Sequence, residues 1–447
     1  MSAEDTIFAL ASGMGRAGIA VIRLSGSAAG AALKSLTGTE PPLPRQAKRT
    51  NLVNFQGEVL DDGLVLWFPA PASFTGEDVV ELHVHGGTAV INTLQAALST
   101  LPGLRPAEAG EFSRRAFEND KMDLTAAEGL ADLIEAETEA QRKQARRQSR
   151  GELGRLYDAW RERLIRAQAL SEADIDFSDE DIPDDLMGEA RSIASQMAKE
   201  IASHLDDAHR GERLRTGLYL AIIGPPNAGK SSLLNRLAKR DAAIVSDIAG
   251  TTRDVIDVHL DLGGYPVIAA DTAGLREAGD SIETEGVRRA RERAEDADMK
   301  LAVFDAADLQ GAAGLDPLTL ELVDSNTLVI LNKSDLAHGA LPDQVKKRPV
   351  LALSAKTGQG FDALLASLQA QASELLAGGT GPGLTRQRHR DALKACHEAL
   401  QRAVGATEVE LLGEDLRLAA RELGRLTGRV DVEDLLDVIF SKFCIGK

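Results

Sequence analysis

The sequence GPPNAGKS at residues 224–231 decides the fold of the central part of the chain. It matches the pattern GxxxxGK[ST], follows the strand-like run LYLAIIG and precedes a helical pattern, which is the context that a phosphate-binding loop requires. Gly224 and Gly229 allow backbone amides to wrap around phosphates, Lys230 can reach the β- and γ-phosphate oxygens, and the Ser231 hydroxyl can ligate Mg²⁺. The motif therefore predicts a site for a nucleoside triphosphate whose base it does not specify.

Two later motifs favour guanine as the base. NKSD at residues 332–335 follows a strand-like run, and Asp335 offers a carboxylate to the two adjacent N–H donors on the Watson–Crick edge of guanine. Adenine lacks this pair of donors, so a buried Asp335 would remain unpaired beside adenine. SAK at residues 354–356 also follows a strand-like run, as expected for a loop that closes over the base.

Two motifs between these predict contacts with the metal ion and the γ-phosphate. GTTRD at residues 250–254 supplies Thr252 as a hydroxyl ligand for Mg²⁺. In DTAG, which ends the run YPVIAAD, Asp271 can hold a water of the Mg²⁺ shell and the Gly274 amide can contact the γ-phosphate. The five motifs together resemble the translation-factor-related small GTPases of the TrmE–Era–EngA type.

The residue after the DxxG glycine departs from the Ras-like pattern. Ras-like proteins have a Gln there that orients the attacking water, whereas this chain has Leu275, which can neither donate nor accept a hydrogen bond. A carboxylate and a cation near the γ-phosphate could replace the Gln, because phosphoryl transfer needs positioning and charge neutralisation.

The pattern around these motifs predicts a multidomain α/β protein. Buried-type strands alternate with helices from residue 217 to residue 378, which predicts an inserted P-loop domain with a parallel sheet and helices on both faces. Residues 1–120 show short strand-like runs between Gly and Pro clusters, which predicts a small α+β domain. Residues 121–216 and 379–447 are helical, and each block has an apolar stripe that needs a partner, so we expect them to pack together as one discontinuous α-helical domain. TAAE at residues 125–128 is interpreted as a capping box at the start of the first block.

The composition excludes several classes of protein. The chain has 447 residues, with 51 Lys and Arg against 69 Asp and Glu, and a net charge of −18, which argues against nonspecific coating of nucleic acid. Glu4 and Asp5 stand where a secretory signal carries positive charge, and no apolar run is long enough to span a bilayer. Two cysteines, Cys396 and Cys444, cannot form a disulfide framework. We expect a cytoplasmic protein without a membrane partner.

Seven stretches along the chain resemble one family. They are GRAGIAVIRLSG, SFTGEDVVELHVHGG, GEFSRRAFENDKMDL, GPPNAGKSSLLN, IVSDIAGTTRD, DTAGLRE and the terminal FCIGK. The family is that of the tRNA-modification GTPases called MnmE or TrmE, and the resemblance runs from residue 5 to the last residue. It implies an N-terminal folate-binding-like domain that dimerises, a discontinuous helical domain and an inserted GTPase domain, in agreement with the pattern above.

The resemblance also implies a function and partners. The chain would act as a homodimer with a flavoprotein of the MnmG (GidA) type, in a heterotetramer or larger complex, with FAD on that partner. The complex would convert C5 of the wobble uridine, position 34 of certain tRNAs, to an aminomethyl-type derivative such as carboxymethylaminomethyl. The carbon would come from a tetrahydrofolate derivative in the 5,10-methylene or 5-formyl form. GTP hydrolysis, stimulated by K⁺ together with dimerisation of the G domains, would move these domains rather than supply carbon chemistry.

The predicted GTP site contains the motif residues and neighbours that the resemblance adds. Its residues are Asn227, Ala228, Gly229, Lys230, Ser231, Ser232, Ser246, Asp247, Ile248, Ala249, Gly250, Thr251, Thr252, Asp271, Thr272, Ala273, Gly274, Asn332, Lys333, Asp335, Ser354, Ala355 and Lys356. Ser231 and Thr252 would ligate Mg²⁺. Lys230 and Glu283 would be catalytic, because Glu283 in SIETEG matches the family carboxylate that orients the hydrolytic water. A solvated surface position is the alternative for this one Glu among many.

The family positions for K⁺ and folate also have counterparts. The K⁺ ligands would be Asn227, Ser246, Ile248 and Thr251, with a side-chain oxygen from Asn227 and a backbone carbonyl from Ile248. The folate positions match Arg23, Glu81, Lys121 and Lys447. A cation suits the glutamate tail of folate, and a carboxylate suits the adjacent N–H donors of the pterin ring. Cys444 would lie near the folate and substrate region, as a nucleophile, an acid or a structural thiol.

Three motifs have simpler interpretations. GMGRAG at residues 13–18 matches the dinucleotide fingerprint, but a β-type run follows it, so we expect a loop between strands rather than an NAD site. For His83 and His85 we favour packing or hydrogen bonding over zinc. The four terminal residues resemble a prenylation box only in the position of the cysteine.

Two other kinds of GTPase remain as alternatives. A ribosome-assembly GTPase would carry an RNA-binding domain or a basic tail, and the sequence has neither. A signalling or scaffold GTPase would have an N-terminal domain that binds no small molecule. Folate binding by the N-terminal domain would separate these classes.

Overall fold

The protein is described by a computed structural model that covers residues 5–176, 185–239, 257–271, 291–309, 315–377, 382–430, 433–441 and 443–446. The chain divides into two compact units. One contains Met1–Ala131, Gln148–Ala198 and Ala395–Lys447, and the other contains Asp132–Arg147 and Lys199–Lys394. Both units join segments that are distant in the sequence, while the three domain ranges given above remain a prediction.

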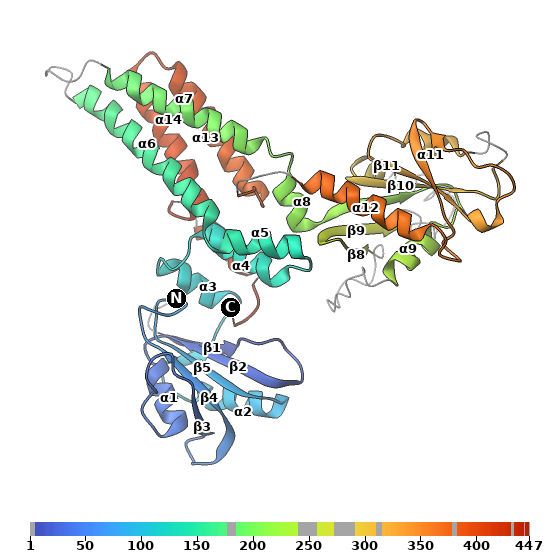
Figure 1. Cartoon of the computed structure of the whole chain (residues 1–447). Helices are drawn as coiled ribbons and strands as arrows, with labels where there is room; N and C mark the ends of the chain where they lie inside the picture. Colours follow the sequence, from blue (N-terminus) through green and yellow to red (C-terminus); the bar gives the residue numbers. More distant parts are fainter. Residues whose placement is uncertain are drawn as a thin grey trace, which may run out of the picture. The chain divides into compact units, whose positions relative to one another are not determined.

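The N-terminal part of the first unit is a six-stranded sheet with helices, drawn in blue in Figure 1. The strand order is β3-β4-β5-β2-β1-β6. The strands are β1 (Thr6–Leu10), β2 (Ala17–Ser25), β3 (Lys48–Val53), β4 (Val59–Phe68), β5 (Val79–Gly86) and β6 (Leu104–Pro106), and the helices are α1 (Ala29–Thr37), α2 (Thr88–Ser99) and α3 (Glu111–Glu118). The α+β prediction is confirmed. The first four residues of GMGRAG lie in the loop between β1 and β2, as expected, whereas Ala17 and Gly18 begin β2.

This sheet forms because its central strands alternate buried and less buried residues. Ile22 and Leu24 of β2 and Leu82 of β5 are fully buried, and they share one core cluster with Leu33 of α1 and Leu94 of α2. β2 pairs antiparallel with β5 in a register that sets Arg23 opposite Glu81. The pleat therefore directs these two polar residues away from the face that is packed against α1 and α2.

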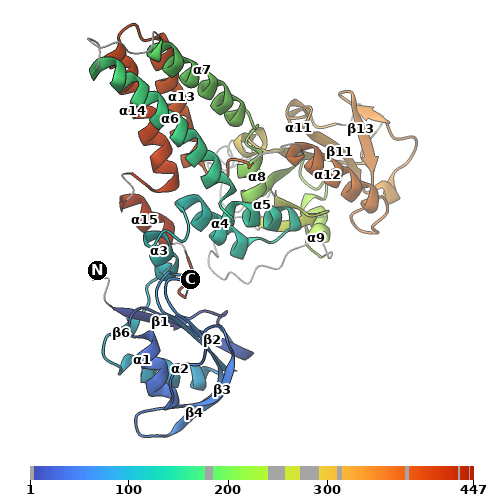
Figure 2. The same ribbon diagram turned by 60° about the vertical axis from the view of Figure 1, so that its left-hand side comes forward.

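Long helices form the rest of the first unit and continue into the second. They are α4 (Leu124–Glu135), α5 (Glu139–Ser149), α6 (Glu152–Asp176), α7 (Leu186–Leu205), α13 (Gln387–Gly405), α14 (Val409–Thr427) and α15 (Glu433–Phe440). Figures 1 and 2 both show α6 beside α14. The apolar stripe expected at the start of this region consists of Leu153, Leu156, Trp160 and Leu164; along α6 Leu156 is half-buried and the other three are buried. The expected packing of the two helical blocks on each other is therefore observed.

The capping-box interpretation of TAAE is wrong. The helix α4 begins at Leu124, and Asp123 caps it: Ala126 N donates to Asp123 Oδ1 at 2.9 Å and Thr125 Oγ1 donates to the same oxygen at 2.5 Å. An ionised carboxylate is a strong acceptor for the free amides of a first helical turn, and it precedes the Thr in the chain.

The last helix, α15, packs beside α3 and the start of α4. Phe440 is buried with Leu436 against Leu124, and the ring centroids of Phe440 and Phe117 lie 6.4 Å apart. The C-terminal apolar stripe thus finds its partner partly in the N-terminal domain, and the predicted pairing with the first helical block is only part of the packing.

The second unit is built on a seven-stranded sheet of order β12-β13-β11-β10-β7-β9-β8. Its strands are β7 (Leu218–Ile223), β8 (Asp257–Leu262), β9 (Tyr265–Asp271), β10 (Met299–Asp305), β11 (Thr327–Asn332), β12 (Gln344–Val345) and β13 (Arg348–Ala352), and its other elements are α8 (Arg210–Thr216), α9 (Lys230–Ala238), α11 (Pro317–Glu321), η2 (Ser334–Leu336) and α12 (Phe361–Leu376). The five inner strands are mutually parallel, as predicted, whereas the edge strands β8 and β12 pair antiparallel with their neighbours.

Two separate cores cover the two faces of this sheet. Leu220 and Ile222 of β7 belong to the cluster that contains Leu233 of α9, whereas the alternate residues Ala221 and Ile223 belong to a second cluster. Burial on both faces explains the nearly continuous apolar runs of the inner strands. Among the described residues, no helix combines the length and the apolar character needed to cross a membrane.

Candidate functional site

The phosphate-binding loop joins β7 to α9. Asn227 adopts a left-handed backbone conformation with φ of 63°, and its side chain is exposed. Lys230 begins α9 and is 8% exposed, and its Nζ donates to the carbonyl oxygens of Gly224 at 3.0 Å and Pro225 at 2.9 Å. The ammonium group therefore lies over the loop that is expected to hold phosphates. Ser231 and Ser232 follow it with exposed side chains at the N-terminus of the helix.

Asn332 connects this loop to the two base motifs. It ends β11 and is 2% exposed. Its Nδ2 donates to the carbonyl oxygen of Ala228 at 2.8 Å, and its Oδ1 accepts from Ala355 N at 2.9 Å. One amide side chain thereby satisfies a backbone acceptor of the phosphate loop and a backbone donor of the SAK loop, and it brings the three motifs together.

The residues after Asn332 present the base-binding edge. Lys333 has φ of 59°, and its Nζ lies 2.5 Å from Asp305 Oδ2 at the end of the neighbouring strand β10. Asp335 lies in the short η2 helix and is exposed. The carboxylate is therefore not buried by the protein itself, contrary to the assumption above, and only a bound base would cover it. Its preference for guanine remains a prediction.

The SAK loop is closely organised. Ser354 is fully buried, and its Oγ accepts from Thr357 N at 3.1 Å. Ala355 is buried, whereas Lys356 is exposed. The sequence did not indicate two further residues of this region: Asp305, which pairs with Lys333, and Arg236 of α9, which donates to the loop. Both come from other elements, so only the three-dimensional structure brings them to the motifs.

Several predicted residues lie outside the described part of the chain. They are Ser246, Asp247, Ile248, Ala249, Gly250, Thr251, Thr252, Thr272, Ala273, Gly274, Glu283 and Lys447. Asp271 is described only as the last residue of β9. Of the expected metal ligands, Ser231 and Asn227 are described, and both carry the oxygen atoms that Mg²⁺ and K⁺ prefer.

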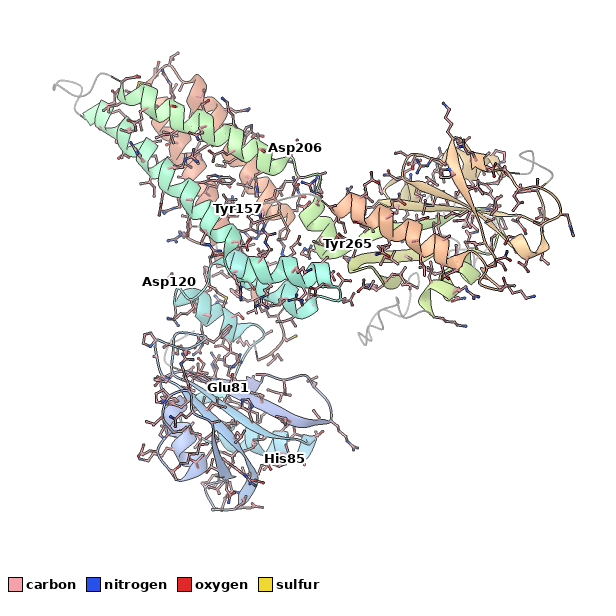
Figure 3. The ribbon with its side chains drawn as sticks, viewed as in Figure 1. Glu81, His85, Asp120, Tyr157, Asp206 and Tyr265 are labelled. Carbon is pink, nitrogen blue, oxygen red and sulfur yellow. The ribbon has the colours of Figure 1, made fainter. Side chains whose placement is uncertain are left out.

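The N-terminal domain contains a cavity of about 410 Å³. Arg23 and Glu81 line it as an ion pair, in which Arg23 Nε and Nη2 lie 3.1 Å and 2.8 Å from Glu81 Oε1. Figure 3 labels Glu81 on this sheet. The Arg23 guanidinium lies over the rings of Phe74 and Phe112, at 5.5 Å and 5.9 Å from their centroids. The site thus offers a carboxylate and aromatic faces, which suit a planar heterocycle with N–H donors.

Other lining residues were not predicted from the sequence. Arg45 and Phe68 belong to the same cavity, and the Arg45 guanidinium lies 5.5 Å from the centroid of the Phe68 ring. Lys121, a predicted folate residue, is exposed and does not belong to the residues that line the cavity. It lies beside the loop at Gly76, close to the segment that follows Phe74.

The C-terminal tail lies against the N-terminal domain. Ile445 forms a β-bridge with Ala109, which places the exposed Cys444 beside the start of α3. The other cysteine, Cys396, is fully buried, and burial raises the pKa of its thiol to about 12, so it stays protonated at neutral pH. Cys444 is therefore the accessible thiol of the two.

The two histidines of β5 are hydrogen-bonded, as favoured above. His83 Nε2 lies 3.2 Å from Glu81 Oε2, and His85 Nδ1 lies 2.7 Å from Asp61 Oδ1. The strand β4 brings Asp61 and Asp62 within reach of His85, so potential metal ligands do stand nearby in space although not in sequence. His85, labelled in Figure 3, is exposed, and hydrogen bonds already connect these groups.

Comparison with known proteins identifies the family. The family models "GTP-binding protein TrmE N-terminus" and "MnmE helical domain" match residues 6–121 and 124–444. The tRNA modification GTPase MnmE of Paramagnetospirillum magneticum is 59% identical over 444 residues, which cover 99% of this chain and 100% of that protein. The protein of the same name from Parvibaculum lavamentivorans is 57% identical over 448 residues, which cover 99% of this chain and 100% of that protein. The one from Rhodospirillum rubrum is 55% identical over 456 residues, which cover 99% of each chain. The chain belongs to the MnmE (TrmE) family of tRNA modification GTPases.

Proposed function

We propose that the chain hydrolyses GTP and, with a flavoprotein of the MnmG (GidA) type, modifies C5 of the wobble uridine of certain tRNAs to an aminomethyl-type group such as carboxymethylaminomethyl. The carbon comes from a 5,10-methylene or 5-formyl tetrahydrofolate bound in the N-terminal domain. K⁺ stimulates hydrolysis together with dimerisation of the G domains, and the complex works in the cytoplasm. The relatives that carry the name tRNA modification GTPase support this proposal.

One observation carries the assignment to GTP. The side chain of Asn332 binds the phosphate loop at Ala228 and the base loop at Ala355 at the same time. Asp335, whose side chain is exposed, follows three residues further along the chain in η2, and in this proposal its carboxylate binds the base. A guanine base can donate its N1–H and 2-amino hydrogens to that carboxylate, whereas adenine cannot.

In this proposal, described residues and residues outside the described part of the chain share the roles in hydrolysis. Lys230 gives up its contacts with the two loop carbonyls for the β- and γ-phosphates, whose negative charge its ammonium then neutralises. Ser231 would hold Mg²⁺ with Thr252, and Asn227 would hold K⁺ with Ser246, Ile248 and Thr251. The two cations supply charge neutralisation at the phosphates. Glu283 orients the water in place of the missing Gln.

The cavity beside the Arg23–Glu81 pair supports the folate site. Glu81 can accept from the N–H donors of a pterin ring, and Phe74 offers a face to stack against it. The anionic tail of the folate then needs cations, which Arg45 at the cavity, Lys121 nearby and Lys447 can provide. In this proposal the FAD is carried by the flavoprotein partner.

Exposed apolar side chains on the N-terminal domain support a homodimer. Met14 is 95% exposed, Phe55 74% and Ile19 66%, and Val59 and Leu64 are also exposed. Aromatic residues and methionine, such as Phe55 and Met14, are enriched at protein interfaces relative to the rest of a protein surface.

Nucleoside analysis tests the modification directly. Cells that lack the protein should contain unmodified wobble uridine in the affected tRNAs, and expression of the wild-type chain should restore the modification. A normal wobble nucleoside in the deletion strain would exclude the proposed function. Hydrolysis that is as fast in Na⁺ as in K⁺ would remove the K⁺ site from the proposal.

The base assignment has its own test. The substitution Asp335→Asn replaces an acceptor oxygen by an amide donor, which opposes the 2-amino group of guanine and suits the 2-oxo group of xanthine. The variant should bind XTP better than GTP, whereas the wild type should prefer GTP. An unchanged preference for GTP would contradict the role of Asp335.

A further inference from the structure

Arg236 lies on the phosphate-binding helix, but its side chain reaches the base-binding loop. Its Nη1 donates to the carbonyl oxygens of Ala355 at 2.8 Å and Lys356 at 3.1 Å, and its Nη2 donates to that of Thr357 at 3.3 Å. Three consecutive carbonyls of the SAK segment therefore point toward one guanidinium group on α9.

Two further residues, Phe361 and Gly358, shape the space that the guanidinium occupies. It lies 5.6 Å from the centroid of the Phe361 ring, and this residue is fully buried at the start of α12. Gly358 has φ of 92°, and a Cβ at this position would lie 2.1 Å from Arg236 Nη2. The loop thus has a residue without a side chain at the point where the guanidinium needs space.

These contacts determine the direction of the loop amides. In a planar trans peptide the carbonyl of one residue and the N–H of the next point in opposite directions. Because the Ala355 carbonyl points to Arg236, the Lys356 N–H points away from it. On its other side the loop is tied by the bond from Ala355 N to Asn332 Oδ1. Arg236 and Asn332 together hold the orientation of the loop.

A site for guanine needs a hydrogen-bond donor beside the carboxylate that binds the N–H edge of the base. Its N1–H and 2-amino hydrogens match the Asp335 carboxylate, and its adjacent 6-oxo atom is an acceptor. The N–H groups of Ala355 and Thr357 already donate to Asn332 Oδ1 and Ser354 Oγ. The donor for the 6-oxo group in this inference is therefore the N–H of Lys356, whose direction depends on the peptide plane that Arg236 holds through the Ala355 carbonyl.

We propose that Arg236 is a positioning residue that links the phosphate-binding helix to the base-binding loop and thereby sets the affinity for the 6-oxo group of guanine. This inference rests on the proposed GTP site. Arg236 touches neither the phosphates nor the base in this role, and it acts through the backbone of Ala355, Lys356 and Thr357.

The test uses the full-length chain and three diphosphates that differ at the base. GDP has the 6-oxo and 2-amino groups, IDP has only the 6-oxo group, and 2-aminopurine riboside diphosphate has only the 2-amino group. Arg236→Ala should raise the Kd for GDP and IDP by the same factor, roughly tenfold to a hundredfold, which is the contribution of about one hydrogen bond to a charged group. The Kd for the 2-aminopurine nucleotide should change less than about twofold, because this nucleotide has no 6-oxo group that could accept a hydrogen bond from the loop.

Two further variants separate positioning from general destabilisation. Arg236→Lys keeps the charge but can reach fewer carbonyls, so its affinity for GDP should lie between those of the wild type and Arg236→Ala. Lys239→Ala removes an exposed cation just after the same helix and should bind all three nucleotides like the wild type. In GTP hydrolysis, the loss in Arg236→Lys should appear in KM rather than in kcat.

Three outcomes would overturn the inference. An equal loss for all three nucleotides would assign Arg236 to the general stability of the domain. An unchanged Kd for GDP and IDP would remove it from the site. A loss in kcat without a change in KM would place it in hydrolysis. If the wild-type chain itself did not prefer GDP to the other two nucleotides, the proposed GTP site would fail instead, and the two failures are therefore distinguishable.

Discussion

The side-chain amide of Asn332 donates a hydrogen bond of 2.8 Å to the carbonyl oxygen of Ala228, 104 residues earlier in the chain. The bond crosses from the end of β11 to the phosphate loop and lies in a buried environment, where Asn332 is 2% exposed. A buried carbonyl without a partner is costly, so this contact ties the geometry of the phosphate loop to that of the base motif.

Asn332→Ala should therefore damage both stability and nucleotide binding. It leaves the carbonyl of Ala228 and the amide of Ala355 without their side-chain partner, and each unsatisfied buried group costs about 1–3 kcal/mol. We expect a lower melting temperature and a Kd for GDP that is raised at least tenfold, measured by thermal unfolding and by titration of a fluorescent GDP analogue. Asn235→Ala, at an exposed position of α9, is the matched control and should change neither. Wild-type affinity of Asn332→Ala would show that the link is dispensable.

The phosphate loop was predictable from the sequence, whereas this link was not. The motif GPPNAGKS, the strand before it and the helix after it are adjacent in the sequence. The spacing within the motif therefore suffices to place Lys230 and Ser231. Asn332 was expected at the site as part of NKSD, but its bond to Ala228 depends on the order of strands in the sheet. Arg236 belongs to no motif, and its role depends on the path of a loop that lies more than a hundred residues later in the sequence.

The N-terminal cavity shows the same division between local and distant information. The strand runs of β2 and β5 follow from alternation, but the pairing of Arg23 with Glu81 depends on their register. Arg45 lies in a loop without a regular pattern, and no local signal distinguishes it from other exposed arginines. The antiparallel edge strand β8 was missed because alternation of strands and helices predicts only the parallel part of a sheet.

Glu81→Gln should weaken folate binding while the domain remains folded. The amide retains one acceptor oxygen, but its N–H group opposes the donors of a pterin ring and its pairing with Arg23 weakens. Hydrogen bonds to charged groups contribute about 1.5–3 kcal/mol, so the Kd for 5-formyltetrahydrofolate should rise at least tenfold. Calorimetric titration measures this change.

The pair of Arg49 and Asp62 provides the control for Glu81→Gln. Its guanidinium contacts a carboxylate with the same two nitrogens, at 3.1 Å and 2.6 Å, but on the exposed surface of the same domain. Asp62→Asn should leave folate binding and the melting temperature unchanged. Equal effects of the two substitutions would show that charge, and not the cavity, determines binding.

The pair of His85 and Asp61 should give a measurable pH dependence. The hydrogen bond and the charge of Asp61 raise the pKa of His85 above its ordinary 6.5. Burial raises the pKa of Asp61, but the hydrogen bonds from the backbone and ring of His85 outweigh it and lower this pKa below 3.8. The stabilisation of the fold by protonated His85 is therefore complete below pH 6.5 and disappears as the pH rises through the folded pKa of His85. The stabilisation by ionised Asp61 is present above pH 3.8 and disappears as the pH falls through the folded pKa of Asp61. An NMR titration should place the pKa of His85 above 6.5 in the wild type and move it back toward that value in Asp61→Asn, while Asp62→Asn should change it much less.

Gly446→Ala should release the C-terminal tail from the N-terminal domain. Gly446 has φ of 98°, which side chains rarely adopt, and a Cβ there would lie 2.2 Å from the carbonyl oxygen of Leu10. The left-handed backbone alone costs an alanine roughly 1–2 kcal/mol. The bridge between Ile445 and Ala109 should therefore open more often, and the amides of residues 444–446 should exchange about fivefold to thirtyfold faster in hydrogen–deuterium exchange. Gly405→Ala is the matched control, because a Cβ at Gly405 meets nothing within 4 Å and its backbone is not left-handed. If Cys444 acts from its docked position, Gly446→Ala should also lower the wobble modification in cells while GTP hydrolysis stays at the wild-type rate. Exchange at Ile445 that matches the wild type would mean that the tail adapts to the extra methyl group, and its docking would then not depend on the glycine.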